Sequence, residues 1–386
     1  MDFRLGASAE ALRAEVHDFV RDFMTHEVEE RLYRTGVSHD AEYTAALAER
    51  GWLAAGWPVE WGGQGRDPLE LLVLAEEMTY VDAPTIAPTV TTMVSKVIHA
   101  VATDEVKREV LPKALAGEII VALGFSEPEA GSDVAAAQTR ALRDGDEWVI
   151  SGQKMFTTNA HLADYVFLLT RTNTAVPKHK GLTMFLVPMK QDGIEVQAVY
   201  TLSGERTNIT YFNDVRVDDR WRIGEVDQGW RVMTVSLQDE HSAGFGTRID
   251  RLAEAAEAWA RDEVDGEGRP RIDDPDVREC LGRCATDAEV SLLLQRRATW
   301  LAETGTVPEA EGPMSKLFSS EALGRNAEDL VELMGPEALR SYFEPTAPQN
   351  GRIEHTLRYS LGTTIYAGTS EVQRNIIAQR GLGLPR

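Results

Sequence analysis

Cysteine is scarce in this sequence, and long apolar runs are missing from it. Cys280 and Cys284 are the only two cysteines among the 386 residues, and they lie four positions apart in a helix-like stretch. We therefore expect both to be small core residues on one helix face rather than a redox pair or metal ligands. No apolar run approaches the ~18 residues of a transmembrane helix, and residues 1–4 open no signal-peptide pattern. These absences predict a cytoplasmic protein without membrane insertion.

Basic residues are outnumbered by acidic ones. The sequence has 62 Asp and Glu against 40 Lys and Arg, which gives a formal charge of −22 at pH 7. Such a balance argues against nucleic acid or an anionic membrane as a general partner. A phosphate-bearing substrate would need a local basic patch. With 43% hydrophobic residues, a chain of this length can build ample core, in about two or three domains.

Several common catalytic motifs are absent as well. There is no GxSxG elbow and no HExxH helix, which argues against the commonest serine hydrolases and zinc proteases. The eight histidines are scattered along the chain. No GxGxxG follows a predicted strand. The sequence Gly244-Phe245-Gly246 lies inside a helical pattern, so we expect any dinucleotide to be held by something other than a Rossmann turn.

Apolar periodicity divides the chain into three predicted domains, at 1–117, 118–228 and 229–386. The first and third have helical spacing, and the second has short strand-like runs separated by turn residues. We predict an α+β fold with an N-terminal helical domain, a central antiparallel β-barrel or sandwich, and a C-terminal four-helix bundle. The predicted strands are 119–123, 148–150, 165–169, 183–187 and 211–215, and the long C-terminal helices lie near 230–263, 274–303, 314–334 and 354–380.

Two helix starts in the first domain have capping signals. Ser8 is predicted to cap a first amphipathic helix that runs to about Arg34. Asp67, Pro68 and Glu70 form the pattern of a capping box with proline in the first turn, so a further helix should begin there.

The most informative stretch runs from 124 to 159. Gly124, Gly131 and Gly152 let the backbone turn or approach a flat ligand closely, and short hydroxyl side chains are frequent around them. Phe156 adds an aromatic face. This set suits a neutral planar heterocycle, whose ring edge needs hydrogen bonds and whose face needs an apolar cover, whereas a metal would need clustered ligands. We predict a cofactor site without a metal.

Four motifs in this chain carry a resemblance to one family. Phe125-Ser126-Glu127-Pro128-Glu129-Ala130-Gly131-Ser132-Asp133 resembles the flavin-binding signature of the acyl-CoA dehydrogenase family. Three further blocks agree with the family in order, and the resemblance therefore spans almost the whole chain and implies FAD as the cofactor. The blocks are Trp57-Pro58-Val59-Glu60-Trp61-Gly62-Gly63, Gly152-Gln153-Lys154-Met155-Phe156-Thr157-Thr158-Asn159 and Tyr366-Ala367-Gly368-Thr369-Ser370-Glu371-Val372-Gln373-Arg374.

The resemblance implies a set of binding residues. Ser126 and Thr158 match residues that contact the flavin ring, and Phe156 matches an aromatic residue that packs on the face of this ring. The alternative is structural: Ser126 would cap a turn, and Phe156 would fill the core. The implied cofactor-binding residues are Phe125, Ser126, Gly131, Ser132, Phe156, Thr157, Thr158, Thr369 and Glu371. The implied substrate-binding residues are Ser132, His241, Tyr366 and Gly368.

The catalytic base is displaced relative to most of the family. Many relatives carry a glutamate immediately before Gly-Thr-Ser, but this chain has Ala367, which cannot accept a proton. The Ala367 N–H remains, and the resemblance implies that it helps hold the thioester oxygen. In the isovaleryl-type branch, alanine also occupies this position and the base is a helix glutamate, matched here by Glu240; the alternative is that Glu240 is an ordinary helix carboxylate. His241 follows it where relatives usually have arginine.

Two motifs that bind the far end of FAD in relatives are changed. Where many relatives have Arg-x-x-Phe-Gly, this chain has Arg269-Pro270-Arg271-Ile272-Asp273, and where they have Gln-x-x-Gly-Gly it has Glu332-Leu333-Met334-Gly335-Pro336. A carboxylate at Glu332 would repel a pyrophosphate. Either its role has moved or the adenine end is bound differently.

The resemblance implies FAD-dependent dehydrogenation of an acyl-CoA thioester to a 2,3-enoyl-CoA. A glutamate removes the α-proton while the β-hydride passes to flavin N5, and electron-transfer flavoprotein is the implied electron acceptor. We expect a homo-oligomer arranged as a dimer of dimers, or a heterotetramer. Two alternatives stay open: one subunit of a heteromeric dehydrogenase of the sterol side-chain type, or a flavin oxygenase or oxidase on the same fold.

Overall fold

The structure is a computed structural model that describes residues 4–240, 244–306 and 308–385, with the side chains of 236–240 left outside the description. The chain forms two compact units that do not follow its linear order. Unit 1 joins Met1–Met24 and Asp67–Ala83 to Glu240–Arg386. Unit 2 comprises Thr25–Arg66 and Pro84–Asp239.

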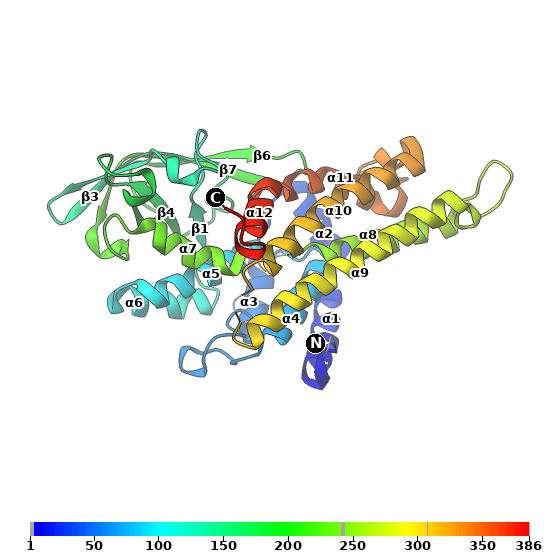
Figure 1. Cartoon of the computed structure of the whole chain (residues 1–386), viewed down its shortest axis with the longest axis horizontal. Coiled ribbons are helices and arrows are strands. Elements are labelled where there is room, and N and C mark those ends of the chain that lie inside the picture. The colour runs from blue at the N-terminus through cyan, green and yellow to red at the C-terminus, as the bar shows by residue number, and fades with distance from the viewer. Residues whose placement is uncertain (1–3, 241–243, 307, 386) are drawn as a thin grey trace. The chain divides into compact units, whose positions relative to one another are not determined.

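Unit 2 is built on one mixed sheet (Figure 1). Its strand order is β6-β7-β3-β2-β4-β5-β8, and β1 pairs with β4. Among the described strands the two ends of this order, β6 and β8, do not pair, so the sheet is not closed. The strands are β1 (Val121–Gly124), β2 (Arg140–Asp144), β3 (Glu147–Lys154), β4 (Tyr165–Arg171), β5 (Leu182–Pro188), β6 (Ile194–Tyr200), β7 (Arg206–Asp218) and β8 (Arg222–Ile223).

The predicted order of helical, sheet and helical parts is confirmed, but the sheet is mixed and open rather than an antiparallel barrel. β1 runs parallel to β4, with Val121 opposite Tyr165 and Gly124 opposite Leu168. A parallel pair needs a crossover connection, which is usually a helix. Here the β2–β3 hairpin and the turn before it make the crossover. The absence of a helix-length segment between the strands therefore did not exclude a parallel pair, and the prediction of a purely antiparallel sheet was wrong.

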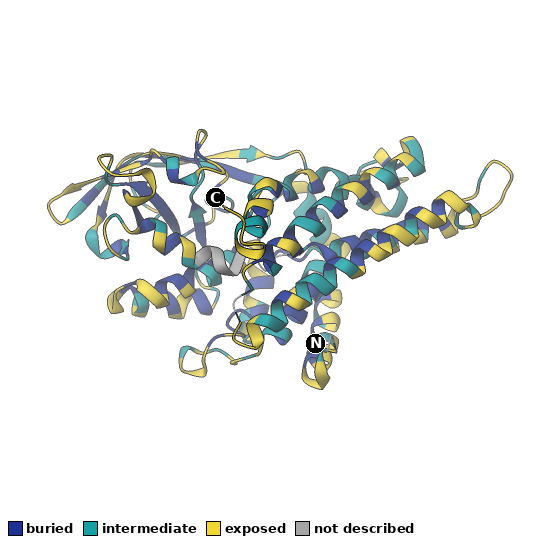
Figure 2. Ribbon diagram, in the orientation of Figure 1, coloured by how far each residue is buried: buried dark blue, intermediate teal, exposed yellow. Residues whose placement is uncertain are grey.

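Helices cover the sheet of unit 2 and complete its core. Val94 and Ile98 of α5 and Val110 of α6 are fully buried in one cluster with Phe167 and Leu186 of the sheet. Figure 2 shows the dark, buried strands at the centre of this unit. Burial of this apolar surface is the main stabilising contribution to the unit. Its helices are α2 (His26–Thr35), α3 (Ala41–Glu49), α5 (Ile86–Val101), α6 (Asp104–Leu115) and nearly all of α7 (Gly229–Glu240).

Unit 1 is helical, and the long helices α8 to α11 pack against their neighbours in chain order. Cys280 and Cys284 are buried in its core, as predicted. The capping box at Asp67 and Glu70 is also confirmed, whereas Ser8 does not cap α1 but donates to Glu70 Oε1 at 2.6 Å. The helices are α1 (Gly6–Phe23), α4 (Pro68–Tyr80), α8 (Gly246–Asp262), α9 (Pro275–Glu303), α10 (Glu311–Met334), α11 (Arg352–Thr363) and α12 (Ser370–Ile376).

Three predicted helices are divided in the structure. The first, predicted from Ser8 to about Arg34, becomes α1 and α2, and the two others lie in the C-terminal part of the chain. The predicted helix 230–263 becomes α7 and α8, and Gly244-Phe245-Gly246 precedes or begins the second of them. The predicted helix 354–380 is interrupted between Thr363 and Ser370. Glycines weaken a helix interior because they lose the most backbone freedom, and both of the C-terminal breaks contain glycine. None of the described helices is long and apolar enough to cross a membrane.

An acidic residue ties the N-terminal helices of unit 1 to its C-terminal helices. Asp82, just after α4, accepts hydrogen bonds from Arg248 and Arg251 of α8. Burial would raise the pKa of Asp82, but the two guanidinium groups outweigh this and lower it to about 2. Arg248 also lies over the Tyr359 ring, 4.4 Å from its centroid. The carboxylate therefore fixes α8 to the segment that follows α4.

We predict that Asp82→Asn lowers the free energy of unfolding by about 2 kcal/mol, because two buried charge-assisted bonds are lost. The folded-state pKa of Asp82 is lower than the ordinary 3.8, so its contribution is present above that value and is lost as the pH falls through about 2. Urea unfolding at several pH values measures it. Asp262→Asn, at the exposed end of α8, is the control. An equal effect of both variants at pH 7 would contradict the assignment.

Candidate active site

The turn that follows β1 has a fixed geometry of its own. Glu127 and Ala130 exchange backbone hydrogen bonds of 2.9 and 3.1 Å, which makes Pro128-Glu129 a tight two-residue turn. The carbonyl oxygen of Ser126 accepts from the Met155 N–H at 2.9 Å. The two motifs that sequence analysis placed at 125–133 and 152–159 are thus joined directly by their backbones.

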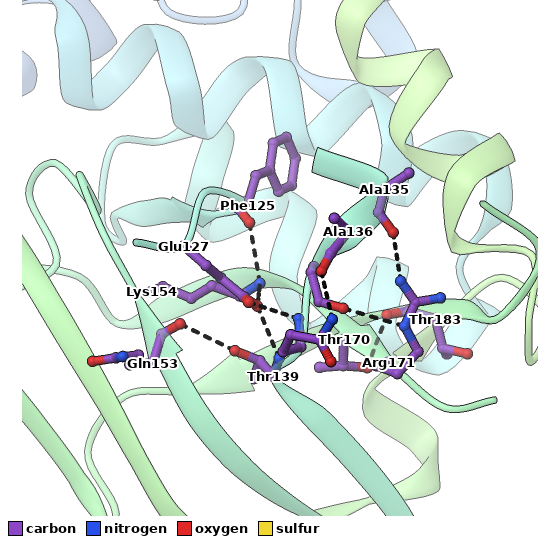
Figure 3. A network of polar contacts seen from close by, with 12 residues as sticks. Phe125, Glu127, Ala135, Ala136, Thr139, Gln153, Lys154, Thr170, Arg171 and Thr183 are labelled. Carbon is purple, nitrogen blue, oxygen red and sulfur yellow. Dashed lines mark hydrogen bonds and ion pairs between the residues drawn. The ribbon is translucent and has the colours of Figure 1, made fainter. Parts of the chain in front are cut away.

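A buried ion pair strengthens this junction (Figure 3). Lys154, the last residue of β3, has no solvent exposure, and its Nζ lies 2.7 Å from Glu127 Oε1 and 3.1 Å from the Phe125 carbonyl oxygen. The Glu127 carboxylate also accepts from the backbone N–H groups of Gln138 at 2.6 Å and Thr139 at 2.9 Å. Both ends of the turn are therefore held by one carboxylate and one ammonium group.

Burial shifts the pKa values of the two groups in opposite directions. Burial raises the pKa of the Glu127 carboxyl, but Lys154 and the backbone donors outweigh it, so this pKa lies below its ordinary value. Burial lowers the pKa of Lys154 to about 8 although Glu127 opposes the shift. At neutral pH the pair is therefore ionised, and removal of either charge would leave the other one buried and unpaired.

Arg171 binds the segment that follows this turn, around Ala135 and Ala137. This residue ends β4, and its guanidinium donates to the carbonyl oxygens of Ala135, Lys178 and Ala137, the last at 3.2 Å. Figure 3 shows Lys154 and Arg171 on adjacent parts of the same polar network. Three charged side chains therefore help to position this loop, together with buried alanines such as Ala135 and Ala137.

The segment after β3 presents an aromatic ring outward. Phe156 has φ of +60°, a left-handed conformation that is unusual for a non-glycine residue, and 58% of the residue is exposed. Phe156 does not fill the core, which removes the alternative considered for it. The Thr158 hydroxyl lies 3.1 Å from the Thr207 hydroxyl, and Thr158 is partly exposed. An apolar face and a hydroxyl therefore lie two residues apart on an accessible turn.

These residues fit a flat heterocycle unequally. Phe125 and Ser126 are partly exposed, and Gly131 and Ser132 lie on the exposed part of the same turn. Thr157 differs, because it is fully buried, its N–H donates to Asn208 O, and its hydroxyl has no partner among the described residues. Thr157 thus supports the turn from beneath and cannot offer its own side chain to a ligand on the surface.

The second group of predicted residues lies in unit 1, in the turn between α11 and α12. Ala367 has φ of +53° and Gly368 has φ of +83°. To the described residues, the Ala367 N–H donates no hydrogen bond. Thr369 caps α12, because its hydroxyl accepts a hydrogen bond from the Val372 N–H at 3.3 Å. Glu371 is exposed, and hydrogen bonds from its own backbone N–H and from the Thr369 hydroxyl lower the pKa of its carboxyl group. The turn therefore offers a free backbone donor.

Other predicted residues are placed less fully. Glu240 ends α7, but its side chain lies outside the description, as does all of His241. Tyr366 is exposed, and its hydroxyl donates to the Tyr359 hydroxyl at 2.9 Å. Glu332 is exposed on α10, and Arg269 pairs with Asp265 at 2.8 Å.

Sequence reasoning missed the side chains that hold the site turns. Glu127 and Lys154 lie within the family motifs but have no role assigned from the sequence, and nothing in the sequence singles out Arg171. One signal in the sequence pointed to Lys154. Side chains alternate between the two faces of a strand, and Lys154 lies an even number of residues after Trp148 and Ile150, which are buried on β3. A lysine at an inward position of a strand needs a buried partner.

Comparison with family models matches nearly the whole chain in three segments. Residues 7–118 match the acyl-CoA dehydrogenase N-terminal domain, 122–219 the middle domain and 227–382 the C-terminal domain.

Individual relatives agree with these matches. The chain is 37% identical to acyl-CoA dehydrogenase FadE26 of Mycobacterium tuberculosis, with 98% of this chain and 97% of the relative covered. Among solved structures, it is similar to the ChsE4-ChsE5 complex from M. tuberculosis, with a TM-score of 0.93, 36% identity and full coverage of both chains. It is also similar to the Tcur3481-Tcur3483 steroid ACAD, with a TM-score of 0.93, 35% identity and full coverage of both.

We predict that Lys154→Met lowers the free energy of unfolding by about 3–5 kcal/mol, because Glu127 is left buried without its cation. Addition of Glu127→Gln should recover part of this loss, since glutamine keeps an acceptor for the backbone donors but carries no charge. A double-mutant cycle by urea unfolding measures the coupling.

Lys190→Met is the matched control for this cycle. Lys190 is 84% exposed and pairs with Asp164 at 3.0 Å, so its removal should change the free energy of unfolding by less than about 1 kcal/mol. Additive effects of Lys154→Met and Glu127→Gln would show that the pair is not coupled.

Proposed function

The chain belongs to the acyl-CoA dehydrogenase family, and from that premise we propose that it oxidises an acyl-CoA thioester to the 2,3-enoyl-CoA with Glu240 as the base. FAD is the cofactor, and when bound it takes up the hydride that leaves Cβ. We propose Phe125, Ser126, Phe156 and Thr158 as the residues that hold its ring. Gly131, Ser132, Thr369 and Glu371 complete the proposed cofactor-binding set, and the buried Thr157 supports the turn from beneath.

One observation carries the proposal for the ring site. Phe156 keeps a largely exposed ring in a left-handed turn whose neighbours are fixed to the sheet. Covering this ring with a ligand would remove apolar surface from water, which is favourable. Thr158 supplies a hydrogen-bonding group beside it. Together they match a flat ligand with an apolar face and a polar edge.

The proposed reaction depends on making the α-proton acidic enough to remove. We propose that the Ala367 N–H donates to the thioester oxygen and so stabilises the negative charge that develops there as the proton leaves. Support comes from the Ala367 N–H, which donates to no described residue, and from the strained φ of this residue. We assign Tyr366, Gly368, Ser132 and His241 to the surroundings of the substrate.

The proton itself needs a carboxylate, and Ala367 cannot supply one. We propose Glu240 at the end of α7 for this role, because it matches the base of the isovaleryl-type branch that also has alanine at the usual position. Electron-transfer flavoprotein is the proposed electron acceptor.

A second proposal concerns assembly. Two of the similar solved structures are named as two-protein systems, the ChsE4-ChsE5 complex and the Tcur3481-Tcur3483 steroid ACAD. This supports a heteromeric enzyme of the sterol side-chain type, in which this chain pairs with a different subunit. The alternative is a homo-oligomer in which this chain supplies all residues.

An anaerobic titration tests the proposed function. The purified protein is mixed with a panel of short, long and sterol-derived acyl-CoAs, and bleaching of the flavin absorbance is followed. Bleaching by this chain alone supports a self-sufficient dehydrogenase, and bleaching only after a second chain is added supports the heteromeric form. In a separate aerobic assay, rapid oxygen consumption in the presence of acyl-CoA would instead favour an oxidase.

We predict that Phe156→Ala with Thr158→Ala weakens FAD binding about ten- to hundredfold, because the face cover and an edge hydrogen bond are both lost. Flavin content per chain and FAD titration of the apoprotein measure the change. Leu162→Ala, which truncates a nearby apolar residue with 39% exposure, is the control. Unchanged FAD binding in a folded double variant would remove this site.

We predict that Glu240→Gln slows flavin reduction by acyl-CoA about 10²–10⁴-fold and leaves FAD bound, because glutamine keeps the size but accepts no proton. Stopped-flow reduction under anaerobic conditions measures the rate. Glu257→Gln, a half-exposed helix carboxylate of α8, is the control. Reduction of Glu240→Gln at the parent rate would show that the base lies elsewhere.

A further inference from the structure

The turn that carries Ala367 has a backbone conformation that alanine does not adopt without support. Ala367 and Gly368 have φ of +53° and +83° in succession. Glycine tolerates this region, but the Cβ of alanine crowds the backbone there. A non-glycine residue in such a conformation persists only when its surroundings hold it. The described residues show what these surroundings are.

Two buried side chains of unit 1 hold the carbonyl groups of this turn. Lys316 of α10 is 1% exposed, and its Nζ donates to the Gly368 carbonyl oxygen at 2.7 Å. Gln373 of α12 is fully buried, and its Nε2 donates to the Ala367 carbonyl oxygen at 2.9 Å. The contact is close, since a Cβ added at Gly368 would lie 2.7 Å from Gln373 Nε2. Helices α10 and α12 therefore fix two successive peptide groups.

The direction of the Ala367 N–H follows from this anchoring. The peptide group after Ala367 is planar and is fixed through its carbonyl oxygen. Rotation about φ of Ala367 is then the motion that turns the preceding peptide group, which carries the Ala367 N–H. A return to the ordinary negative φ would swing this N–H away by a large angle. The left-handed φ and the two carbonyl anchors thus define one orientation of the donor.

We propose that Lys316 and Gln373 are positioning residues that hold the Ala367 N–H in the orientation needed to polarise the thioester carbonyl. This inference rests on the proposed function and extends it to side chains that touch neither substrate nor cofactor. A charged donor suits the task at Gly368, because a hydrogen bond from an ammonium group to a carbonyl is stronger than one from a neutral donor. An effect on rate is expected because small displacements of an oxyanion donor weaken its action steeply.

The test uses acetoacetyl-CoA as a probe on the FAD-loaded protein. The enolate of this short β-ketoacyl thioester is favoured when the thioester oxygen accepts hydrogen bonds. The ultraviolet absorbance of the bound enolate is titrated against pH. A purely structural role of Lys316 would weaken binding of the probe without changing the apparent pKa of the bound molecule.

In Lys316→Met we expect the apparent pKa of bound acetoacetyl-CoA to rise by about one unit, and flavin reduction by the best acyl-CoA of the panel to slow about ten- to hundredfold. Adding Ala367→Gly should recover part of the shift, because glycine adopts the left-handed conformation without support. Arg325→Met is the matched control, since it removes a different cation of α10, one that pairs with Asp287 at 2.7 Å.

If Lys316→Met does not fold, Gln373→Met gives the same test from the other carbonyl. Parent-like values of the bound pKa and of the reduction rate in the folded variants would overturn the positioning role and leave the proposed function intact. If the parent protein is reduced by no acyl-CoA, either alone or with a second chain, the proposed function fails, and this inference fails with it.

Discussion

A lysine ammonium group without access to water must be surrounded by oxygen atoms, and this requirement shapes the turn that we propose to bind the flavin ring. Lys154 is fully buried at the end of β3, and the oxygens that satisfy it come from Glu127 and from the Phe125 carbonyl. The turn before β2 is therefore folded onto β3 by the need to neutralise one charge. Buried alanines of the same segment, among them Ala130 and Ala137, add apolar packing to this ion pair.

The same device appears in unit 1. Lys316 is also buried, and it too donates to the carbonyl oxygen of a turn that carries a predicted site residue. In both units a buried ammonium group fixes backbone that belongs to no helix or strand. Site loops of this kind need side-chain anchors because their peptide groups lack the repeating hydrogen bonds of regular structure. The cost of burying each lysine is offset by the oxygen atoms that its ammonium group binds, and these bonds give the loop one defined conformation.

This arrangement fits the chemistry of an acyl-CoA dehydrogenase that lacks the usual base. Ala367 contributes only backbone, so the geometry of that backbone has to be maintained by its neighbours. Proton removal and carbonyl polarisation are then tasks of separate elements, with the proposed base on α7 and the proposed donor between α11 and α12. The left-handed φ of Ala367 is unusual for a residue other than glycine, and the proposed role of its N–H would account for it.

Local periodicity, capping signals and short motifs were enough to predict the order of helical and sheet parts, the capping box at Asp67, the burial of Cys280 and Cys284 and the family. These signals need only neighbouring residues. Three features became visible only in the folded chain: the parallel pairing of β1 with β4, the inward Thr157 beside the outward Phe156, and the two turns anchored by Lys154 and Lys316. Each of these depends on residues distant in the chain, since Lys316 and Gly368 are brought together by the packing of α10 against α12. Periodicity within one segment carries no information about which distant carbonyl a buried charge will meet.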